Sequence, residues 1–314
     1  MSNRLGVNQL NQLPKLPIPI PPSYKFTRRT NLPAEPSACF RGRDKELAAI
    51  NSALQARPPH ELGRCTVWGM PGIGKSQLAL AYAQQEFLSS TYDLIIWLSG
   101  TTCEKIMEGL TDALILLEHP ARAETDEKAR SNAFQRWLEQ CADVGCKRWL
   151  IIVDNLDPSA IQVVRQNLPN NMRNGDLLIT TRREDVANSM LRNLGEPIEL
   201  LALSADDSAA LLLERARIPN SSVSQSREVL DIVHRLGCHP LALEQAGAMI
   251  EQRKGNLEML QDMLRGGSYS TVRNQAKLYA RDHQSHETVA AQLEQRAFFT
   301  RDLLDHYFVL WPLG

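Results

Sequence analysis

The chain has 314 residues, 43% of them apolar, which suffices for a sizeable core and suggests about two domains. Lysine and arginine number 35 and aspartate and glutamate number 36, so the formal net charge is −1. This balance argues against a dominant electrostatic attraction to nucleic acid or to an anionic membrane, although it is compatible with a local basic patch.

Residues 1–38 are predicted to form a proline-rich, disordered tail or linker. Proline fixes φ and lacks a backbone N–H, so its recurrence precludes a continuous helix or a central strand. The prolines of this segment are Pro14, Pro17, Pro19, Pro21, Pro22, Pro33 and Pro36. We therefore begin the first folded domain at residue 39.

From residue 39 to residue 203, short apolar runs alternate with helical patterns. Leu47, Ile50 and Leu54 have the spacing of one helix face, for example, whereas residues 149–153 form a continuous apolar run. Strands are predicted at 65–68, 94–98, 149–153, 176–180 and 197–200, and helices at 44–54, 76–87, 103–117, 127–140 and 159–166. Such alternation is typical of a parallel sheet with helices on both faces, so we predict an α/β domain.

After residue 203 the predicted strands stop and only helical patterns follow. Ser204 is the predicted cap of the first helix, with Asp207 three residues later as an imperfect capping box. Helices are expected at 205–216, 225–236, 239–252 and 256–264. We therefore predict a small helical domain over residues 204–265, followed by a helical or poorly ordered segment over residues 266–314.

A phosphate-binding loop (P-loop) follows the first of these strands. The sequence Gly69-Met70-Pro71-Gly72-Ile73-Gly74-Lys75-Ser76 matches the pattern G-x-x-x-x-G-K-[ST] between a strand and a helix. Its glycines let backbone N–H groups point at phosphate oxygens, and the following helix directs its positive end at the same place. We expect Lys75 to reach the β- and γ-phosphates and the Ser76 hydroxyl to ligate Mg²⁺. The predicted nucleotide contacts in this segment are Gly69, Pro71, Gly72, Ile73, Gly74, Lys75, Ser76 and Gln77.

A carboxylate, Asp154, ends the third predicted strand. At this place it can hold Mg²⁺ directly or through water, as in phosphoryl-transfer sites. The next residue, Asn155, is neutral and cannot accept a proton as a general base would. Asp157 could act as the general base instead, or it could cap the helix that begins near Pro158.

Three further motifs accompany the P-loop and Asp154. They are Phe40-Arg41-Gly42-Arg43-Asp44-Lys45-Glu46-Leu47 before the loop, Thr180-Thr181-Arg182 at the end of the fourth predicted strand, and Gly237-Cys238-His239-Pro240-Leu241-Ala242-Leu243 in the helical part. In this order the five motifs resemble the NB-ARC family of STAND P-loop NTPases, and the spelling of the Gly237 segment is most similar to fungal and bacterial members. The resemblance covers residues 38–265 and implies that the ligand is ADP or ATP.

The resemblance also implies roles for individual residues. Phe40–Arg43 would contact adenine and phosphate, Arg182 would sense the terminal phosphate, and Pro240 would pack on the adenine. Other roles stay open for these residues. Arg43 could pair with Glu46 on the helix surface. Arg182 could be solvated and replaced by its neighbour Arg183, and Pro240 could simply begin a helix.

The resemblance ends before the C-terminus. Family members continue into a winged-helix domain with a Met-His-Asp signature that contacts ADP, and residues 268–314 contain no such signature. The implied function is an ADP- or ATP-binding signalling switch, as in NOD-like receptors of immune-type or self/non-self signalling, with slow hydrolysis at most. Two alternatives stay open, namely a turnover ATPase of the AAA+ motor type and a truncated module that no longer switches.

The remaining features concern location and partners. No apolar run reaches the ~18 residues of a membrane span, and no basic stretch followed by an apolar run opens the chain. The six cysteines include no CxxC pair and no zinc spacing with histidine, so we interpret them as reduced thiols. We therefore expect a cytoplasmic protein that binds an adenine nucleotide, self-associates or engages a signalling protein, and binds neither nucleic acid nor membranes.

Overall fold

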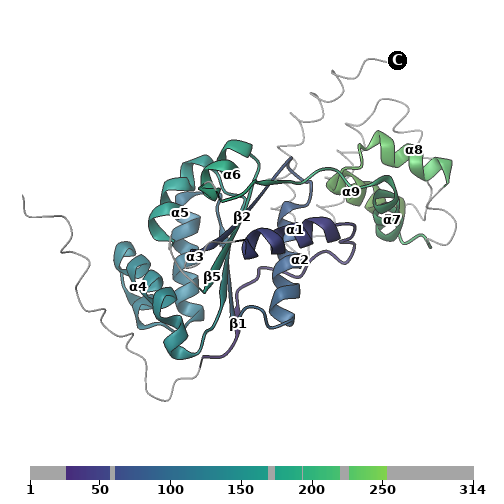
Figure 1. The fold of residues 1–314 in the computed structure, drawn as a ribbon. Helices are drawn as coiled ribbons and strands as arrows, with labels where there is room; N and C mark the ends of the chain where they lie inside the picture. The colour runs from purple at the N-terminus through teal and green to yellow at the C-terminus, as the bar shows by residue number, and fades with distance from the viewer. Residues whose placement is uncertain (1–25, 57–60, 169–173, 193, 220–225, 253–314) are drawn as a thin grey trace, which may run out of the picture.

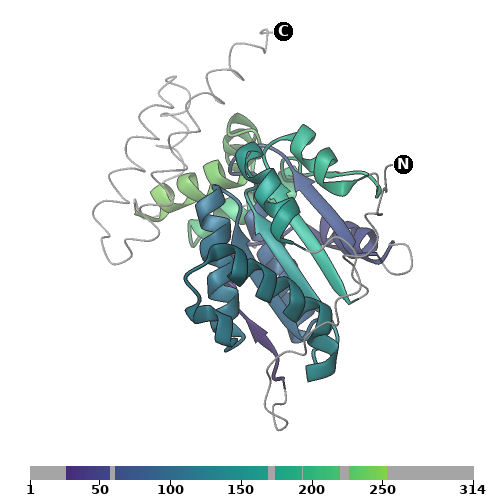
Figure 2. The ribbon, with the colours of Figure 1, turned by 90° about the vertical axis from the view of Figure 1, so that its left-hand side faces the viewer.

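The computed structural model of the chain describes residues 26–56, 61–168, 174–192, 194–219 and 226–252 (Figures 1 and 2). These residues form a parallel sheet flanked by helices, followed by a separate helical cluster that carries the labels α7, α8 and α9 (Figure 1). The predicted α/β fold with a helical part after it is thus confirmed for the described residues.

The described part of the sheet has six parallel strands in the order β1-β3-β4-β5-β2-β6. The strands are β1 (Arg29–Thr30), β2 (Gly63–Trp68), β3 (Leu94–Ser99), β4 (Trp149–Asp154), β5 (Gly175–Thr181) and β6 (Ile198–Glu199). β4 and β5 are buried along almost their whole length, which explains their continuous apolar sequences. Because all strands run the same way, their carboxyl ends share one edge, where ligands of such sheets bind.

Helices cover both faces of this sheet (Figure 1). On one face lie α1 (Asp44–Gln55) and α2 (Lys75–Leu88), which bury Leu54, Leu78 and Tyr82 against the strands. On the other face lie α3 (Cys103–Leu116), α4 (Glu127–Gln140), α5 (Ile161–Asn167) and α6 (Glu184–Leu191). Three short 3₁₀ turns complete the described connections, at Pro120–Ala123, Cys141–Val144 and Pro158–Ala160.

The helical part has its own apolar core. It comprises α7 (Ala205–Arg215), α8 (Arg227–Arg235) and α9 (Pro240–Gln252), which bury Leu212, Ile232 and Leu243 together. The predicted cap is confirmed, because the Asp207 amide donates to Ser204 Oγ at 3.0 Å. Among the described helices, none combines the length and the apolarity that a bilayer crossing requires. The helix predicted at 256–264 and the segment 266–314 lie outside the described residues.

One strand was not predicted from the sequence. Arg29–Thr30 pairs with β3 inside the segment that we assigned to the proline-rich tail, so ordered structure begins before residue 39. Asn31 extends this pairing with its side chain, since its amide accepts a bond from the Trp97 N–H and donates one to the Trp97 carbonyl (2.6 and 3.1 Å). A two-residue strand has no readable apolar period, and Pro33 after it is compatible with an edge position.

The helix α6 was also missed, although its signal is present. Val186, Ala187, Met190 and Leu191 are all buried and repeat with helical spacing. With only eight residues, α6 falls at the short end of the helices that periodicity can identify. Its position matters because it follows directly on the motif at the end of β5.

Candidate nucleotide-binding site

The P-loop connects the carboxyl end of β2 to the first turn of α2. All three of its glycines adopt positive φ: Gly69 (149°), Gly72 (77°) and Gly74 (102°). Residues with a Cβ rarely adopt such angles, so the glycines permit the curled backbone that exposes N–H groups to a phosphate. Gly74 is the N-cap of α2, and the positive end of that helix therefore lies at the loop.

Lys75 contributes the charge of the loop. Its side chain is buried, and Nζ donates to the carbonyl oxygens of Gly69 and Met70, both at 2.8 Å. The ammonium group therefore lies within the curl of the loop, and its contact with the β- and γ-phosphates stays a prediction. This placement puts a full positive charge beside the backbone N–H groups.

Ser76 and Asp154 meet at the carboxyl edge of the sheet. Ser76 Oγ lies 2.8 and 3.0 Å from the two carboxylate oxygens of Asp154. Two neighbouring ligands of an octahedral Mg²⁺, each about 2.1 Å from the ion, are themselves about 3.0 Å apart. The two predicted metal ligands therefore have the separation and the hard oxygen donors that suit Mg²⁺.

Thr180 joins this pair, and the sequence analysis did not assign it a role by itself. Its buried hydroxyl donates to Asp154 Oδ1 at 2.6 Å and accepts a bond from the Asn155 N–H at 2.8 Å. Thr180 thus fixes the orientation of the carboxylate from the adjacent strand. Its place at the carboxyl end of β5 is the only sequence signal that could have identified it.

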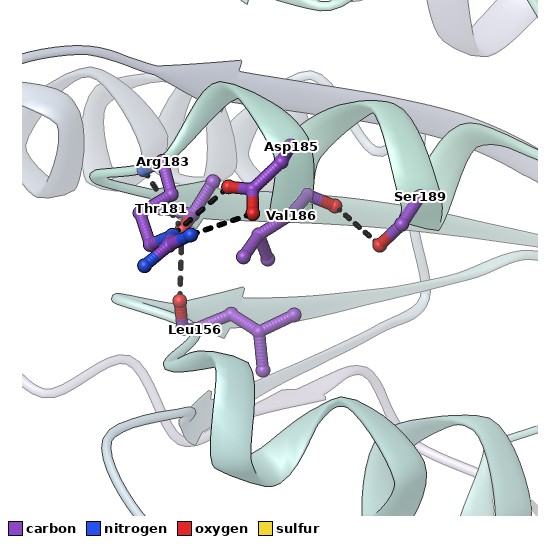
Figure 3. A network of polar contacts seen from close by, with 6 residues as sticks. All are labelled: Leu156, Thr181, Arg183, Asp185, Val186 and Ser189. Carbon is purple, nitrogen blue, oxygen red and sulfur yellow. Dashed lines mark hydrogen bonds and ion pairs between the residues drawn. The ribbon is translucent and has the colours of Figure 1, made fainter.

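Arg182 and Arg183 point in different directions. Arg182 Nε donates to Asn155 Oδ1 at 3.0 Å, next to the strand end that carries Asp154. Figure 3 shows Arg183 turned to Asp185 of α6, with two bonds of 2.9 and 2.7 Å and 59% of its side chain exposed. Between the two arginines that the sequence offered, Arg182 is the one that faces the predicted site.

Asp157 occupies the capping role that the sequence left open. Its carboxylate accepts bonds from the backbone N–H and the hydroxyl of Ser159 at 2.9 and 2.6 Å, at the start of the 3₁₀ turn Pro158–Ala160. These bonds, aided by the charges of Arg182 and Arg183, lower the pKa of the exposed Asp157 carboxyl. Among the described residues its carboxylate bonds only Ser159, and its role in positioning a water molecule stays a prediction.

Residues 40–43 run between the P-loop and the helical part. Arg43 is 5% exposed and donates to the carbonyl oxygens of Leu201 (2.8 Å) and Ile73 (3.3 Å), while it also pairs with Glu46 at 2.9 Å. The pairing with Glu46 was the alternative interpretation, and the bond to Ile73 adds a contact with the P-loop. Arg43 therefore joins the P-loop to residues 200–204, which connect the α/β part to the helical part.

The other members of this segment face the helical part or the core. Arg41 forms an ion pair with Glu214 of α7, and Phe40 packs against the core beneath α1 and α2. Gly42 has φ = 67° and lies so close to the Asp207 carboxylate that a Cβ would overlap it. Gln77 Oε1 accepts a bond from the Ser37 N–H at 2.7 Å. The predicted adenine-contacting segment thus lies where the two parts meet.

Pro240 begins α9, as one of its two interpretations required. The residue before it, His239, was not predicted as a site residue, yet its Nε2 lies 2.9 Å from the Pro71 carbonyl oxygen. The helical part therefore contacts the P-loop directly through the motif that carries Pro240. Sequence spacing alone could not reveal this contact between residues so far apart in the chain.

The sequence model of the NB-ARC domain matches residues 43–222, which is more than half of the chain. The chain belongs to the NB-ARC family. The P-loop, Asp154 and the Thr180–Arg182 motif fall within this match, and the family is one of P-loop nucleotide-binding proteins. A comparison with curated proteins found no match for this NB-ARC protein.

Solved structures resemble this NB-ARC protein in fold. Cdc6p from Pyrobaculum aerophilum is 16% identical with a TM-score of 0.52, over 71% of this chain and 65% of that one. The ADP form of the Aeropyrum pernix ORC2 protein is 13% identical with a TM-score of 0.50, over 75% and 71%. A STAND protein with a tetratricopeptide repeat sensor from Pyrococcus horikoshii is 19% identical with a TM-score of 0.45, over 72% and 31%. At these identities the first two show the P-loop NTPase fold alone.

Proposed function

We propose that this NB-ARC protein binds ADP or ATP with Mg²⁺ at the P-loop and acts as a nucleotide-operated signalling switch. The observation that carries the proposal is the meeting of two features in one place. The loop that suits phosphate and the Ser76–Asp154 pair that suits Mg²⁺ lie at the sheet edge that also contacts the helical part. A change at the phosphates would therefore act directly on the helical part.

Each residue has a physical role in this proposal. Backbone N–H groups of the P-loop and Lys75 would hold the phosphates, and Ser76 and Asp154 would hold Mg²⁺, which would neutralise phosphate charge. Thr180 orients the Asp154 carboxylate through a hydrogen bond. Arg182, which follows the end of β5 and bonds Asn155, would contact the terminal phosphate as a sensor. Phe40–Arg43 and Pro240 flank the junction where the adenine would lie.

Slow hydrolysis is the second element of the proposal. After Asp154 comes Asn155, whose amide oxygen is bonded to Arg182, and the nearest further carboxylate along the chain, Asp157, caps a turn. The Asn155 amide cannot accept a proton as a general base would, and the Asp157 carboxylate is already bonded by Ser159. A protein that retains its nucleotide suits a cytoplasmic switch that self-associates or engages a signalling partner in immune-type or self/non-self responses.

Two measurements on the purified protein distinguish this proposal from its alternatives. Bound nucleotide should be identified after denaturation, and phosphate release should be followed under saturating ATP and Mg²⁺. A switch retains ADP and releases phosphate at much less than one turnover per second. Many turnovers per second would indicate a motor-type ATPase, and the absence of any nucleotide affinity would indicate an inactive module.

Asn155→Asp should raise the rate of ATP hydrolysis by about tenfold at most. Asn155 has φ = 57°, a left-handed conformation that aspartate also tolerates, so the variant should fold. The gain is limited because Arg182 would pair with the new carboxylate and weaken it as a base. Phosphate release under single-turnover conditions measures the change.

The matched control for this variant is Asp157→Ala. This change should leave the hydrolysis rate unaltered and cost about 1 kcal/mol of stability through loss of the cap. A large loss of hydrolysis in Asp157→Ala, with no gain in Asn155→Asp, would show that Asp157 positions the water molecule after all.

A further inference from the structure

His239 brings the helical part against the tip of the P-loop. Its Nε2 lies 2.9 Å from the Pro71 carbonyl oxygen, and its ring packs over the next residue of the loop. A Cβ on Gly72 would lie 2.7 Å from His239 Cε1 and 3.0 Å from a methyl carbon of Leu241. Only glycine at position 72 allows this close approach of imidazole and loop.

The backbone before His239 is shaped to present it. α8 ends at Arg235, and both Gly237 (φ = 62°) and Cys238 (φ = 54°) then take the left-handed conformation. For Cys238 this conformation is unfavourable, so the surrounding contacts must hold it. One such contact is the bond from the Leu203 N–H to the Cys238 carbonyl oxygen at 3.2 Å. The turn that carries His239 is therefore bonded to the connection between the two parts of the chain.

The same connection is bonded to the end of β2 and, through Arg43, to the P-loop. The Leu200 N–H donates to the Trp68 carbonyl oxygen at 2.8 Å, just before the loop. Arg43 joins the Leu201 carbonyl oxygen to that of Ile73. Together with His239, these contacts attach the strand end before the loop, the tip of the loop and Ile73 to the segment that leads into the helical part.

Charge links His239 to the phosphate site as well. Partial burial lowers the pKa of His239, and the nearby charge of Lys75 lowers it further, whereas the bond to Pro71 acts in the opposite direction. The neutral ring is thus favoured, with the Nε2 proton available to the Pro71 carbonyl. Phosphates beside Lys75 would offset its charge, so the pKa of His239 would rise when nucleotide binds.

We infer that His239 is a positioning residue that transmits the occupancy of the P-loop to the helical part of the protein. The inference rests on the proposed function and adds the residue that performs the coupling. A phosphate that draws the loop inward moves the Pro71 carbonyl, and the His239 bond passes that movement to α9 and to the Leu203–Cys238 contact. The ring itself need not touch the nucleotide.

The test compares wild type with His239→Ala, His239→Gln and His234→Ala. Glutamine can donate a similar bond, and His234 is an exposed histidine on α8 that serves as the matched control. Amide hydrogen exchange at Leu203 and calorimetric ADP affinity are measured for each protein. In wild type, ADP should slow exchange at Leu203. In His239→Ala this response should vanish while ADP affinity falls by only about twofold to tenfold. His239→Gln should retain most of the response, and His234→Ala should match wild type.

A second measurement does not depend on the alanine variant. ADP binding at pH 6 in two buffers of different ionisation enthalpy gives the number of protons taken up. Wild type should take up more protons than His239→Gln, because only wild type has a ring whose pKa rises. Equal proton uptake by wild type and His239→Gln would overturn the inference while leaving nucleotide binding intact, and so would an unchanged Leu203 response in His239→Ala. If wild type itself shows no affinity for ADP, the proposed function fails and the inference fails with it.

Discussion

Lys75→Ala should reduce the affinity for ADP and ATP on the order of a hundredfold, because it removes the charge that faces the phosphates. The backbone N–H groups and the end of α2 would remain, so binding should weaken severely without reaching zero. The Lys75 ammonium also bonds the Gly69 and Met70 carbonyls. The substitution should therefore lower the free energy of unfolding of the nucleotide-free protein by about 1 to 2 kcal/mol. Calorimetric titration measures the first effect and thermal unfolding measures the second.

A surface lysine gives the matched control for this variant. Lys105 lies on α3 with 56% of its side chain exposed and pairs with Glu108, away from the P-loop. Lys105→Ala should therefore leave both nucleotide affinity and the thermal shift caused by ADP unchanged. Should Lys75→Ala still be stabilised by ADP as much as wild type is, the P-loop does not hold the phosphates.

Much of the fold could be predicted because its strands are long and buried. β4 reads Trp-Leu-Ile-Ile-Val-Asp, and so continuous an apolar run has few alternatives once helical patterns flank it. β1 could not be predicted, since a two-residue edge strand depends on pairing with β3 and on the side chain of Asn31. Short edge strands of this kind form because of tertiary contacts, which the local amino-acid sequence does not predict.

The residues of the candidate site also fall into those that local sequence patterns predict and those that depend on tertiary contacts. The P-loop glycines and Asp154 could be predicted because each has a fixed place relative to a strand end or a helix start. Thr180 and His239 could not, because their roles arise from hydrogen bonds to Asp154 and Pro71 across distant segments. Sequence reasoning could place Asp157 only as one of two alternatives, and the geometry of its bonds to Ser159 was needed to see which one the fold adopts.

Asp154→Asn should abolish the extra affinity that Mg²⁺ gives to nucleotide binding, a loss of at least about tenfold in the presence of the metal. Mg²⁺ requires oxygen ligands at near-ideal octahedral geometry, and a neutral amide oxygen is a much poorer ligand than a carboxylate. Without metal, the affinity for ADP should stay the same or rise slightly, because a negative charge next to the phosphates has been removed. Titrations with ADP in Mg²⁺ and in a chelator give both values.

Asparagine keeps the shape of the side chain, so the variant should fold. One of the two hydroxyl donors, Ser76 or Thr180, can still donate to the amide oxygen. Asp157→Asn is the control for a lost carboxylate nearby, and it should preserve the full Mg²⁺ dependence because the Asp157 side chain bonds only Ser159 among the described residues. If Asp154→Asn depends on Mg²⁺ as strongly as wild type, the metal is held elsewhere. The bonds from Ser76 and Thr180 to Asp154 would then serve only to fasten α2 and β5 to the end of β4.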